Sequence, residues 1–343
     1  MMSESGFQIA VVGATGAMGE ELLLTLERAN LAISSFVPIA SRASSRPTVE
    51  FRGQSFPVKP LGPDALEGVE LAFAVLPQGP GDDLLIEAAE AGCTIVDLAG
   101  IWRDDPQVPM IALGINSALD LERVPTVGVV TSPGPVALAL CAVAEAVTKI
   151  GDLVGITATA MLPAASAGRK GIEELSGQIV ATFNSRPPPR AVFADGLAFD
   201  LIPAWGDIEQ GGWTGLERLT AEQVGQVLGL SPNRVAVNIT IVPLFAGMGM
   251  NVYVRGDARL SAASLREALQ GSRSVQLHDR AGRPLMPRAQ LERAVVSVGR
   301  LRDDPSGDGV HLWIAADPMR LASANAVAIA TELATRGLIG ARV

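Results

Sequence analysis

The fold is decided by residues 7–28, FQIAVVGATGAMGEELLLTLER. The first six residues form a continuous apolar run, which is typical of a parallel β-strand that is covered on both faces. The last nine residues have the apolar spacing of an amphipathic helix. Between them, the glycines Gly13, Gly16 and Gly19 end the strand and open the helix, whose free N–H groups then point at one place. This unit predicts a phosphate-binding turn at the start of a doubly wound, Rossmann-type domain.

Each glycine of the turn has a separate role in a dinucleotide site. Gly13 permits the tight turn, Gly16 lets the backbone approach the pyrophosphate, and Gly19 lets the helix and strand pack closely. We expect Thr15 and Met18, which lie between these glycines, to contact the same cofactor. The alternative is a glycine-rich turn that binds nothing, but the flanking strand and helix favour binding.

The second predicted strand, residues 36–40, ends in a polar segment that indicates which dinucleotide is bound. An NAD site would place Asp or Glu here to bond the ribose hydroxyls. This chain instead offers hydroxyl and guanidinium groups: Ser41, Arg42, Ser44, Ser45 and Arg46. These groups suit a 2′-phosphate, because arginine binds phosphate through two parallel hydrogen bonds. The segment therefore predicts NADP, and a solvated polar loop is the alternative.

Strand-like and helix-like segments alternate as far as residue 133. Strands are expected at 71–76, 94–98 and 126–130, and a helix at 82–91. This alternation predicts an α/β domain with a doubly wound parallel sheet.

The pattern changes after Pro135. Strands are expected at 156–161, 235–242, 251–255 and 310–315, and a helix at 261–269. These segments predict an α+β second domain with a mixed or antiparallel sheet. The alanine-rich segment 321–336 predicts a long C-terminal helix that returns to the first domain.

Composition excludes several classes of protein. Of the 343 residues, 48% are hydrophobic and 18% charged, as in a globular protein. The net charge is −9 and no arginine-rich run occurs, so no nucleic-acid partner is expected. The apolar stretch Val136–Val147 is too short to span a membrane. The polar N-terminus does not resemble a secretory signal, and Cys93 and Cys141 form no metal spacing, so we expect a cytoplasmic protein without a metal.

Several segments, taken in order, resemble the aspartate-semialdehyde dehydrogenase family. Besides GATGAMGEELL and SRASSR they are DLAGIWRDDPQVPMIALGIN (97–116), LAFDLIPAWGD (197–207) and LWIAADPMRLASANAVAIA (312–330). The resemblance implies an NADP-binding domain at 1–133, a substrate and dimerisation domain at 134–320, and a helix at 321–343 that packs on the first domain. It also implies a homodimer that reduces an acyl phosphate to a semialdehyde with NADPH, through a cysteine thioester.

The family's catalytic positions hold apolar residues in this chain. The nucleophilic thiol belongs to an N-P-x-C segment at a helix N-terminus, where the helix dipole lowers its pKa. The matching segment is SPGP (132–135), so Pro135 occupies the thiol position. By the same resemblance Met248 replaces the acid/base histidine, Ile241 a substrate-binding arginine and Leu162 a positioning glutamine.

Several polar side chains and one thiol of this chain also match, or lie near, functional positions of the family. Arg103 matches an arginine that contacts the phosphate, and the alternative is a surface residue paired with Asp104 or Asp105. Asn116 also matches in place, and Asn325 lies near the position where the family binds the nicotinamide. Glu217 matches a substrate-binding acid loosely, and His311 is expected to be structural. Cys141 is expected to pack as a buried apolar group, and the alternative is a substitute nucleophile.

Three functions follow from this pattern. The first is a catalytically impaired paralogue, similar to the Usg-type proteins that lack the cysteine, which keeps the fold, the dimer and NADP(H) binding. The second is an active NADP-dependent aspartate-semialdehyde dehydrogenase of amino-acid biosynthesis. The third is an oxidoreductase of altered substrate, which moves a hydride to an apolar aldehyde or ketone without a thioester.

Overall fold

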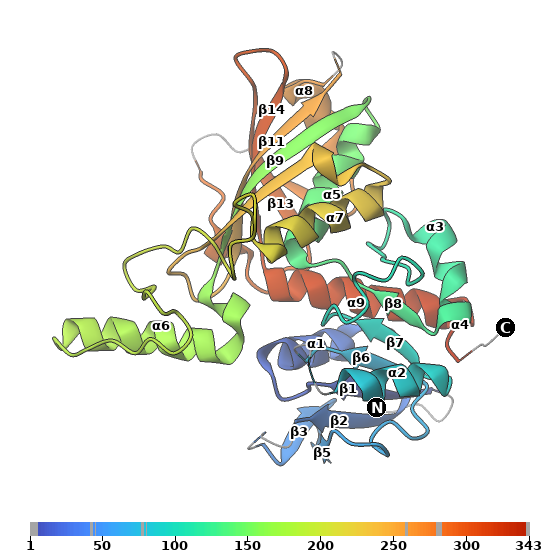
Figure 1. Cartoon of the computed structure of the whole chain (residues 1–343). Coiled ribbons are helices and arrows are strands. Elements are labelled where there is room, and N and C mark those ends of the chain that lie inside the picture. The colour runs from blue at the N-terminus through green and yellow to red at the C-terminus, as the bar shows by residue number, and fades with distance from the viewer. Residues whose placement is uncertain are drawn as a thin grey trace. The chain divides into compact units, whose positions relative to one another are not determined.

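Two separate β-sheets organise the computed structural model (Figure 1). The chain divides into one unit made of Met1–Pro133 with Ala322–Val343, and a second unit, Gly134–Leu321. The residues that the structure describes are 6–41, 44, 46–76, 79, 81–257, 260–278 and 283–340.

The first unit is built on a parallel sheet with the strand order β5-β2-β1-β6-β7-β8, which confirms the predicted Rossmann-type domain. Its strands are β1 (Phe7–Val12), β2 (Ile33–Ala40), β5 (Lys59–Pro60), β6 (Leu71–Ala74), β7 (Thr94–Asp97) and β8 (Val129–Thr131). Its helices are α1 (Ala17–Arg28), α2 (Asp82–Glu90), α3 (Ser117–Asp120), η1 (Leu121–Arg123) and α4 (Val124–Val127). In the same unit, β3 (Thr48–Phe51) and β4 (Gln54–Pro57) form a separate two-stranded antiparallel sheet.

The strand order places the glycine turn at the functional edge of this sheet. β2 lies on one side of β1 and β6 on the other, so the chain direction across the sheet reverses between β1 and β6. In such sheets, ligands bind beyond the carboxyl ends of the strands at the point of reversal. The turn that follows Val12 lies at that point.

The C-terminal helix α9 (Pro318–Thr335) completes the core of the first unit, as predicted, but it begins three residues before the expected residue 321 and ends at Thr335. Its residues Ile329 and Leu333 are fully buried, in one cluster with Val11 of β1 and Leu22 of α1. The division between the two units falls inside α9, after Leu321.

Two local expectations for the first unit were wrong. Helix α1 begins at Ala17 rather than at residue 20. The strand expected at 126–130 is β8, which starts only at Val129, because a helical turn with Pro125 near its start precedes it. Gly128 ends that turn at φ 76°, a left-handed conformation that favours glycine. The apolar run at 126–130, which was interpreted as a strand throughout, therefore begins with the end of a helical turn.

The second unit is built on a mixed sheet with the order β10-β9-β11-β14-β13-β12. The pairs β9–β10 and β12–β13 are parallel, and the other neighbouring strands are antiparallel. This agrees with the predicted mixed or antiparallel sheet. The strands are β9 (Leu153–Leu162), β10 (Val235–Ile241), β11 (Met248–Gly256), β12 (Val275–His278), β13 (Val296–Asp303) and β14 (Gly309–Ala316). The helices are α5 (Pro135–Thr148), η2 (Ala164–Ala167), α6 (Gly168–Phe183), α7 (Gly215–Leu228), η3 (Pro232–Arg234), α8 (Ala262–Gln270) and η4 (Pro287–Gln290).

Helices cover one face of this sheet. Along β9, Ile156, Ala158 and Ala160 are buried whereas Thr157 is exposed, which is the alternation of a strand with one covered face. α5 and α7 lie on the sheet, and α6 stands apart from it within the same unit (Figure 1). No helix in the described part of the chain is long and apolar enough to cross a membrane.

Candidate functional site

The glycine turn has the geometry of a phosphate-binding turn. Gly13 has φ +105°, and the N–H groups of Gly13 and Ala14 both donate to the Ile39 carbonyl, at 2.8 and 3.0 Å. These bonds fix the turn against the end of β2. Gly16 is the N-cap of α1 and has no side chain to cap the helix, so the positive end of the helix stays available to an anion.

The three glycines meet different constraints. A Cβ on Gly19 would lie 2.2 Å from the Gly13 carbonyl oxygen, and one on Gly13 would lie 2.9 Å from the Leu76 nitrogen. Both positions therefore need glycine for the fold. A Cβ on Gly16 would meet nothing nearer than 3.4 Å, and its φ of −80° suits any residue. The fold does not require glycine at position 16, whereas a ligand approaching the turn would.

The predicted 2′-phosphate segment lies against this turn. The Ser44 hydroxyl donates to the Thr15 hydroxyl at 3.1 Å, and the Ser44 N–H donates to the Ser41 carbonyl at 3.0 Å. Arg46 forms an ion pair with Glu20 of α1. Arg42 and Ser45 lie outside the described residues. Glu20 was missed by sequence reasoning, because no local spacing signal links two residues 26 positions apart.

Met18 of the turn contacts α9, and Asn325 belongs to α9. The Ser323 hydroxyl of α9 donates to the Met18 sulfur at 3.5 Å. The Asn325 amide is occupied by the protein itself: it accepts from the Leu113 N–H and donates to the Ile111 carbonyl, each at 2.9 Å. It also donates to the Ser132 hydroxyl. The predicted cofactor residue thus holds α9 to a loop of the same unit.

Asn116 has a comparable structural role. Its side chain accepts from the Ala112 N–H at 3.0 Å and donates to the Met110 carbonyl at 2.8 Å. Both bonds stay within one loop of the first unit, so they order this loop.

Arg103 lies over the loop that follows β7. Its guanidinium donates to the Leu98 carbonyl at 3.2 Å, and a Cβ on Gly100 would lie 2.4 Å from the Arg103 Cζ. Burial lowers the pKa of Arg103, whereas the charge of Asp97, and to a smaller extent that of Asp104, raises it. The suggested surface pairing with Asp104 or Asp105 is therefore replaced by packing inside the loop, with Asp97 as the main charge.

Asp97 is fully buried and organises that loop. Its carboxylate accepts from the Gly100 N–H at 2.7 Å and from the Trp102 N–H at 3.2 Å. Burial raises the pKa of Asp97, and these amides and Arg103 only partly oppose it. Sequence reasoning did not single out Asp97, because an acid at a strand end is equally common as a simple turn residue.

In the second unit, three of the predicted catalytic positions lie together. Leu162 and Ile241 are register partners at the ends of β9 and β10. Met248 opens β11, where the adjacent Gly249 pairs with Met161, next to Leu162. Their side chains are 5%, 1% and 0% exposed, so they form a buried apolar cluster.

Pro135 is the first residue of α5, in the same unit. The N-cap residue Gly134 donates its N–H to the Gln223 side chain at 2.9 Å. Proline suits this first turn, because its missing N–H would have no partner in the helix. This helix start therefore carries neither a thiol nor a proton donor at its first position.

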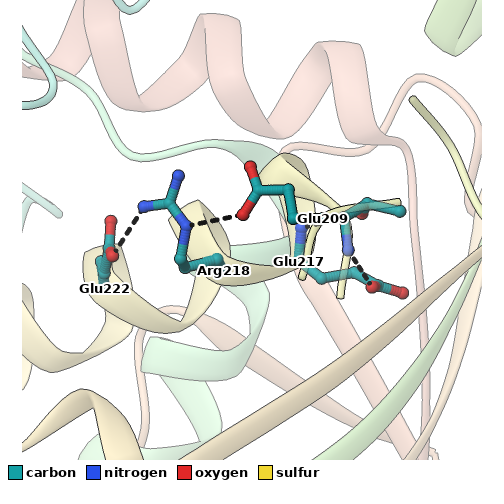
Figure 2. A network of polar contacts seen from close by, with 5 residues as sticks. Glu209, Glu217, Arg218 and Glu222 are labelled. Atoms are coloured by element: carbon teal, nitrogen blue, oxygen red, sulfur yellow. Dashed lines mark hydrogen bonds and ion pairs between the residues drawn. The ribbon is translucent and has the colours of Figure 1, made fainter. Parts of the chain in front are cut away.

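Glu217 is used as a helix cap. Its carboxylate accepts from the Thr214 N–H at 2.9 Å, in a capping box, and from the Ile239 N–H of β10 at 2.8 Å. Both carboxylate oxygens of Glu217 thus have partners within the protein, and a substrate-binding role for Glu217 stays a prediction. On the neighbouring surface Arg218 lies between Glu209 and Glu222, at 3.3 and 2.9 Å (Figure 2).

Neither of the two cysteines of the chain is placed to act as a nucleophile. Cys93 and Cys141 are 5% and 0% exposed. Burial raises the pKa of Cys93 to about 12 and that of Cys141 still further from its ordinary value. His311 bonds to Asp304 at 2.8 Å and stacks on Tyr253. Among the described residues, no group of three or more His, Cys, Asp or Glu could hold a metal ion.

The native thiols should therefore be unreactive. At pH 8 a thiol with a pKa of about 12 is ionised to about one part in ten thousand, against about a quarter of free cysteine. We expect Ellman's reagent to label native protein at least about a thousandfold more slowly than free cysteine, and to titrate two thiols after unfolding. One fast-reacting thiol in the native protein would contradict this assignment.

Models of two protein families match the chain in order. The semialdehyde dehydrogenase NAD binding domain matches residues 8–120, and the semialdehyde dehydrogenase dimerisation domain matches residues 144–321. A USG-1 protein homolog of Azotobacter vinelandii is 31% identical over 333 residues, which cover 96% of this chain and 98% of that protein. The chain belongs to the aspartate-semialdehyde dehydrogenase family.

Other members of the aspartate-semialdehyde dehydrogenase family align with this chain over nearly its whole length. The aspartate-semialdehyde dehydrogenase of Bacillus subtilis is 28% identical, covering 97% of this chain and 99% of that protein. The crystal structure of aspartate semialdehyde dehydrogenase II complexed with ASA, from Vibrio cholerae, superposes with a TM-score of 0.91 at 25% identity. It covers 96% of this chain and 99% of that chain.

Proposed function

We propose that this protein is a family member that binds NADP(H) and forms a homodimer in the cytoplasm, but does not form the thioester on which acyl-phosphate reduction depends. The observation that carries the proposal is the state of its thiols: both cysteines are buried, and burial holds both pKa values far above neutral pH. Pro135 at the start of α5 can supply no nucleophile.

Cofactor binding is supported by the fit of the turn to a dinucleotide. Gly16 leaves room for a pyrophosphate at the uncapped start of α1, and Thr15 and Ser44 bring two hydroxyls to the end of β2. Arg46 supplies a guanidinium at the same edge. A bound nicotinamide would donate or accept a hydride. The residues of this chain would hold the pyrophosphate and the adenosine phosphate.

Arg46 and Glu20 should set the preference between NADPH and NADH. Arg46→Ala should weaken NADPH about tenfold and leave NADH nearly unchanged, because only NADPH carries a phosphate for the guanidinium. Glu20→Gln should tighten NADPH about threefold, because the carboxylate competes for Arg46 and repels the phosphate. Fluorescence titrations of both nucleotides measure the two ratios, and Arg46→Lys is the charge-conserving control. Equal NADPH and NADH affinities in all three variants would contradict NADP specificity.

A homodimer is supported by an apolar surface in the second unit, which we call the α6 patch. It consists of Val180, Phe183, Phe199 and Leu201, which are 58%, 77%, 65% and 53% exposed. The rings of Phe183 and Phe199 meet edge to face, with centroids 5.8 Å apart. Exposed apolar clusters of this kind mark interfaces, and the patch lies inside the matched dimerisation domain.

Introducing a charged side chain into the α6 patch should weaken the dimer. Burying a side chain such as Phe contributes about 1.5–3 kcal/mol, so Phe183→Asp or Phe199→Asp should raise the dimer Kd on the order of tenfold to a hundredfold. Sedimentation equilibrium measures the change. Leu24→Asp, at a 45% exposed apolar residue of the first unit, is the matched control. Unchanged dimers in both Phe variants would place the interface elsewhere.

The proposal is tested by assaying one preparation in two ways. NADPH is titrated first, and saturable binding is expected. Phosphate-dependent oxidation of aspartate semialdehyde with NADP is then measured on the same sample, and no turnover above the enzyme-free rate is expected. Failure to bind either nucleotide would overturn the cofactor proposal, and rapid turnover would overturn the loss of thioester chemistry.

A second candidate is an oxidoreductase that acts on an apolar aldehyde or ketone, because Leu162, Ile241 and Met248 place only hydrocarbon and thioether groups together. A substrate would reach these buried side chains only if they moved. Hydrocarbon side chains at these positions would accept an uncharged substrate more readily than an anion. NADPH consumption with straight-chain aldehydes, compared with Met248→His, tests this candidate. A rate that is absent for every aldehyde would rule it out.

A further inference from the structure

A pocket of about 460 Å³ lies wholly within the first unit, between the end of α2, the loop after β7 and the start of β8. Seven of the ten residues that line it have apolar side chains, among them Ala89 of α2 and Val129 of β8, whereas polar atoms supply the larger share of the exposed lining. Trp102 supplies an aromatic ring. A volume of this size is in the range of pockets that bind small molecules.

The pocket carries negative charge that the described residues do not neutralise. Glu90 and Asp105 both line it, and no ion pair involving either is found in the described part of the chain. No lysine, arginine or histidine lines the pocket. Glu90 is also the last residue of α2, so the negative end of that helix lies at the same place. Each of these features favours a cation over an anion.

The main chain at Trp102 is ordered by hydrogen bonds of its own loop. Its backbone N–H donates to the buried Asp97 carboxylate at 3.2 Å, and its backbone carbonyl accepts from the Asp105 N–H at 3.2 Å. Asp105 in turn accepts from the Gln107 N–H at 2.8 Å. The aromatic ring and one carboxylate therefore project from one ordered loop. A cation beside an indole face is attracted by the ring quadrupole.

We propose that this pocket binds a small organic ammonium ion with an apolar body. The ammonium group would lie between Glu90 and Asp105, and the apolar body would pack against Trp102 and the aliphatic lining. This inference does not depend on NADP binding or on the loss of thioester chemistry, because its residues belong to neither.

Phenethylammonium is a suitable probe, detected by ¹⁹F NMR of protein labelled with 5-fluorotryptophan. The chain has four tryptophans, so Trp205, Trp213 and Trp313 serve as internal controls, and Trp102→Phe assigns the resonance. We expect only the Trp102 resonance to shift, in a saturable way. 2-Phenylethanol and phenylacetate, which have the same ring without the positive charge, should bind at least about fivefold more weakly.

Charge-removing variants test which groups bind the cation. Glu90→Gln and Asp105→Asn should each weaken phenethylammonium about threefold to fivefold. Glu67→Gln, an exposed acid of the same unit outside the pocket, should leave the affinity unchanged. Equal affinity for phenylacetate, or no effect of Glu90→Gln, would overturn the proposal. A Trp102 resonance that does not move at about 10 mM probe, a weaker affinity than such a pocket should give, would also overturn it.

Discussion

Replacing Gly19 with alanine should destabilise the first unit by about 3 kcal/mol or more and abolish NADPH binding, because the added Cβ would lie 2.2 Å from the Gly13 carbonyl oxygen. At an unstrained helical position the same change would stabilise the protein by about 1 kcal/mol, since alanine is the better helix former. The sign of the effect therefore reports the close approach of helix and turn.

Gly16→Ala separates folding from binding. The nearest atom to its Cβ is 3.4 Å away, so the free energy of unfolding should fall only by the cost of alanine at an N-cap, about 1 kcal/mol. NADPH affinity should fall on the order of tenfold to a hundredfold, because the methyl group meets the pyrophosphate. Gly62→Ala, where a Cβ meets nothing within 4 Å, is the control for both measurements. If Gly16→Ala binds NADPH normally, the pyrophosphate does not lie on this turn.

Glu174→Gln should lower the free energy of unfolding of the second unit by about 3 kcal/mol at pH 7. The buried Glu174 carboxylate of α6 accepts from the N–H groups of Ala191, Val192 and Phe193, each at 2.7 Å. An amide in its place would turn an NH₂ group toward at least one of these donors. The segment 191–193 would then lose its attachment to α6, and Phe199 of the α6 patch follows on the same chain segment.

The pH dependence of this effect has a definite sign. Burial alone would raise the pKa of Glu174, but the three backbone donors and Gln178 outweigh it, so the folded-state pKa lies below the ordinary value of 4.5. A lowered carboxyl pKa contributes stability that is present above pH 4.5 and is lost as the pH falls through the folded-state pKa. The difference between wild type and Glu174→Gln should therefore be full at pH 7 and shrink below pH 4.5.

Glu173→Gln, at the exposed neighbouring acid, is the matched control for that series and should be neutral throughout. Urea unfolding at several pH values measures both variants. A destabilisation that grows as the pH falls would contradict the role given to the Glu174 carboxylate.

The parts of this fold that local pattern determines could be predicted from the sequence. The run from Phe7 to Arg28 placed β1, the turn and α1, because apolar period and glycine spacing are set by neighbours in the chain. The boundary of β8 was misplaced, because Pro125 and Gly128 closed a helical turn inside an apolar run. α7 was missed although Thr214 and Glu217 have the capping-box spacing.

The residues of the candidate site also fall into two groups, those that local sequence pattern predicts and those that only long-range contacts bring together. Thr15 and Ser44 were predicted because each lies at the end of a recognisable strand, and the structure brings them together. The pairing of Arg46 with Glu20 and the use of Glu217 by Ile239 depend on contacts more than twenty residues apart, which no local spacing encodes. The resemblance to the family placed Leu162 and Ile241, but only the strand register shows that they are neighbours.

A single-turnover experiment tests the central claim most directly. Protein saturated with NADP is mixed with aspartate semialdehyde in the absence of phosphate, and the absorbance of NADPH and the intact protein mass are followed. In thioester chemistry the aldehyde and the enzyme thiol give an acyl thioester, while a hydride passes to NADP and a proton is released. Because Cys93 and Cys141 are buried and un-ionised, we predict no burst of NADPH and no mass gain. One NADPH per chain, with an acyl adduct that hydroxylamine removes, would contradict the account.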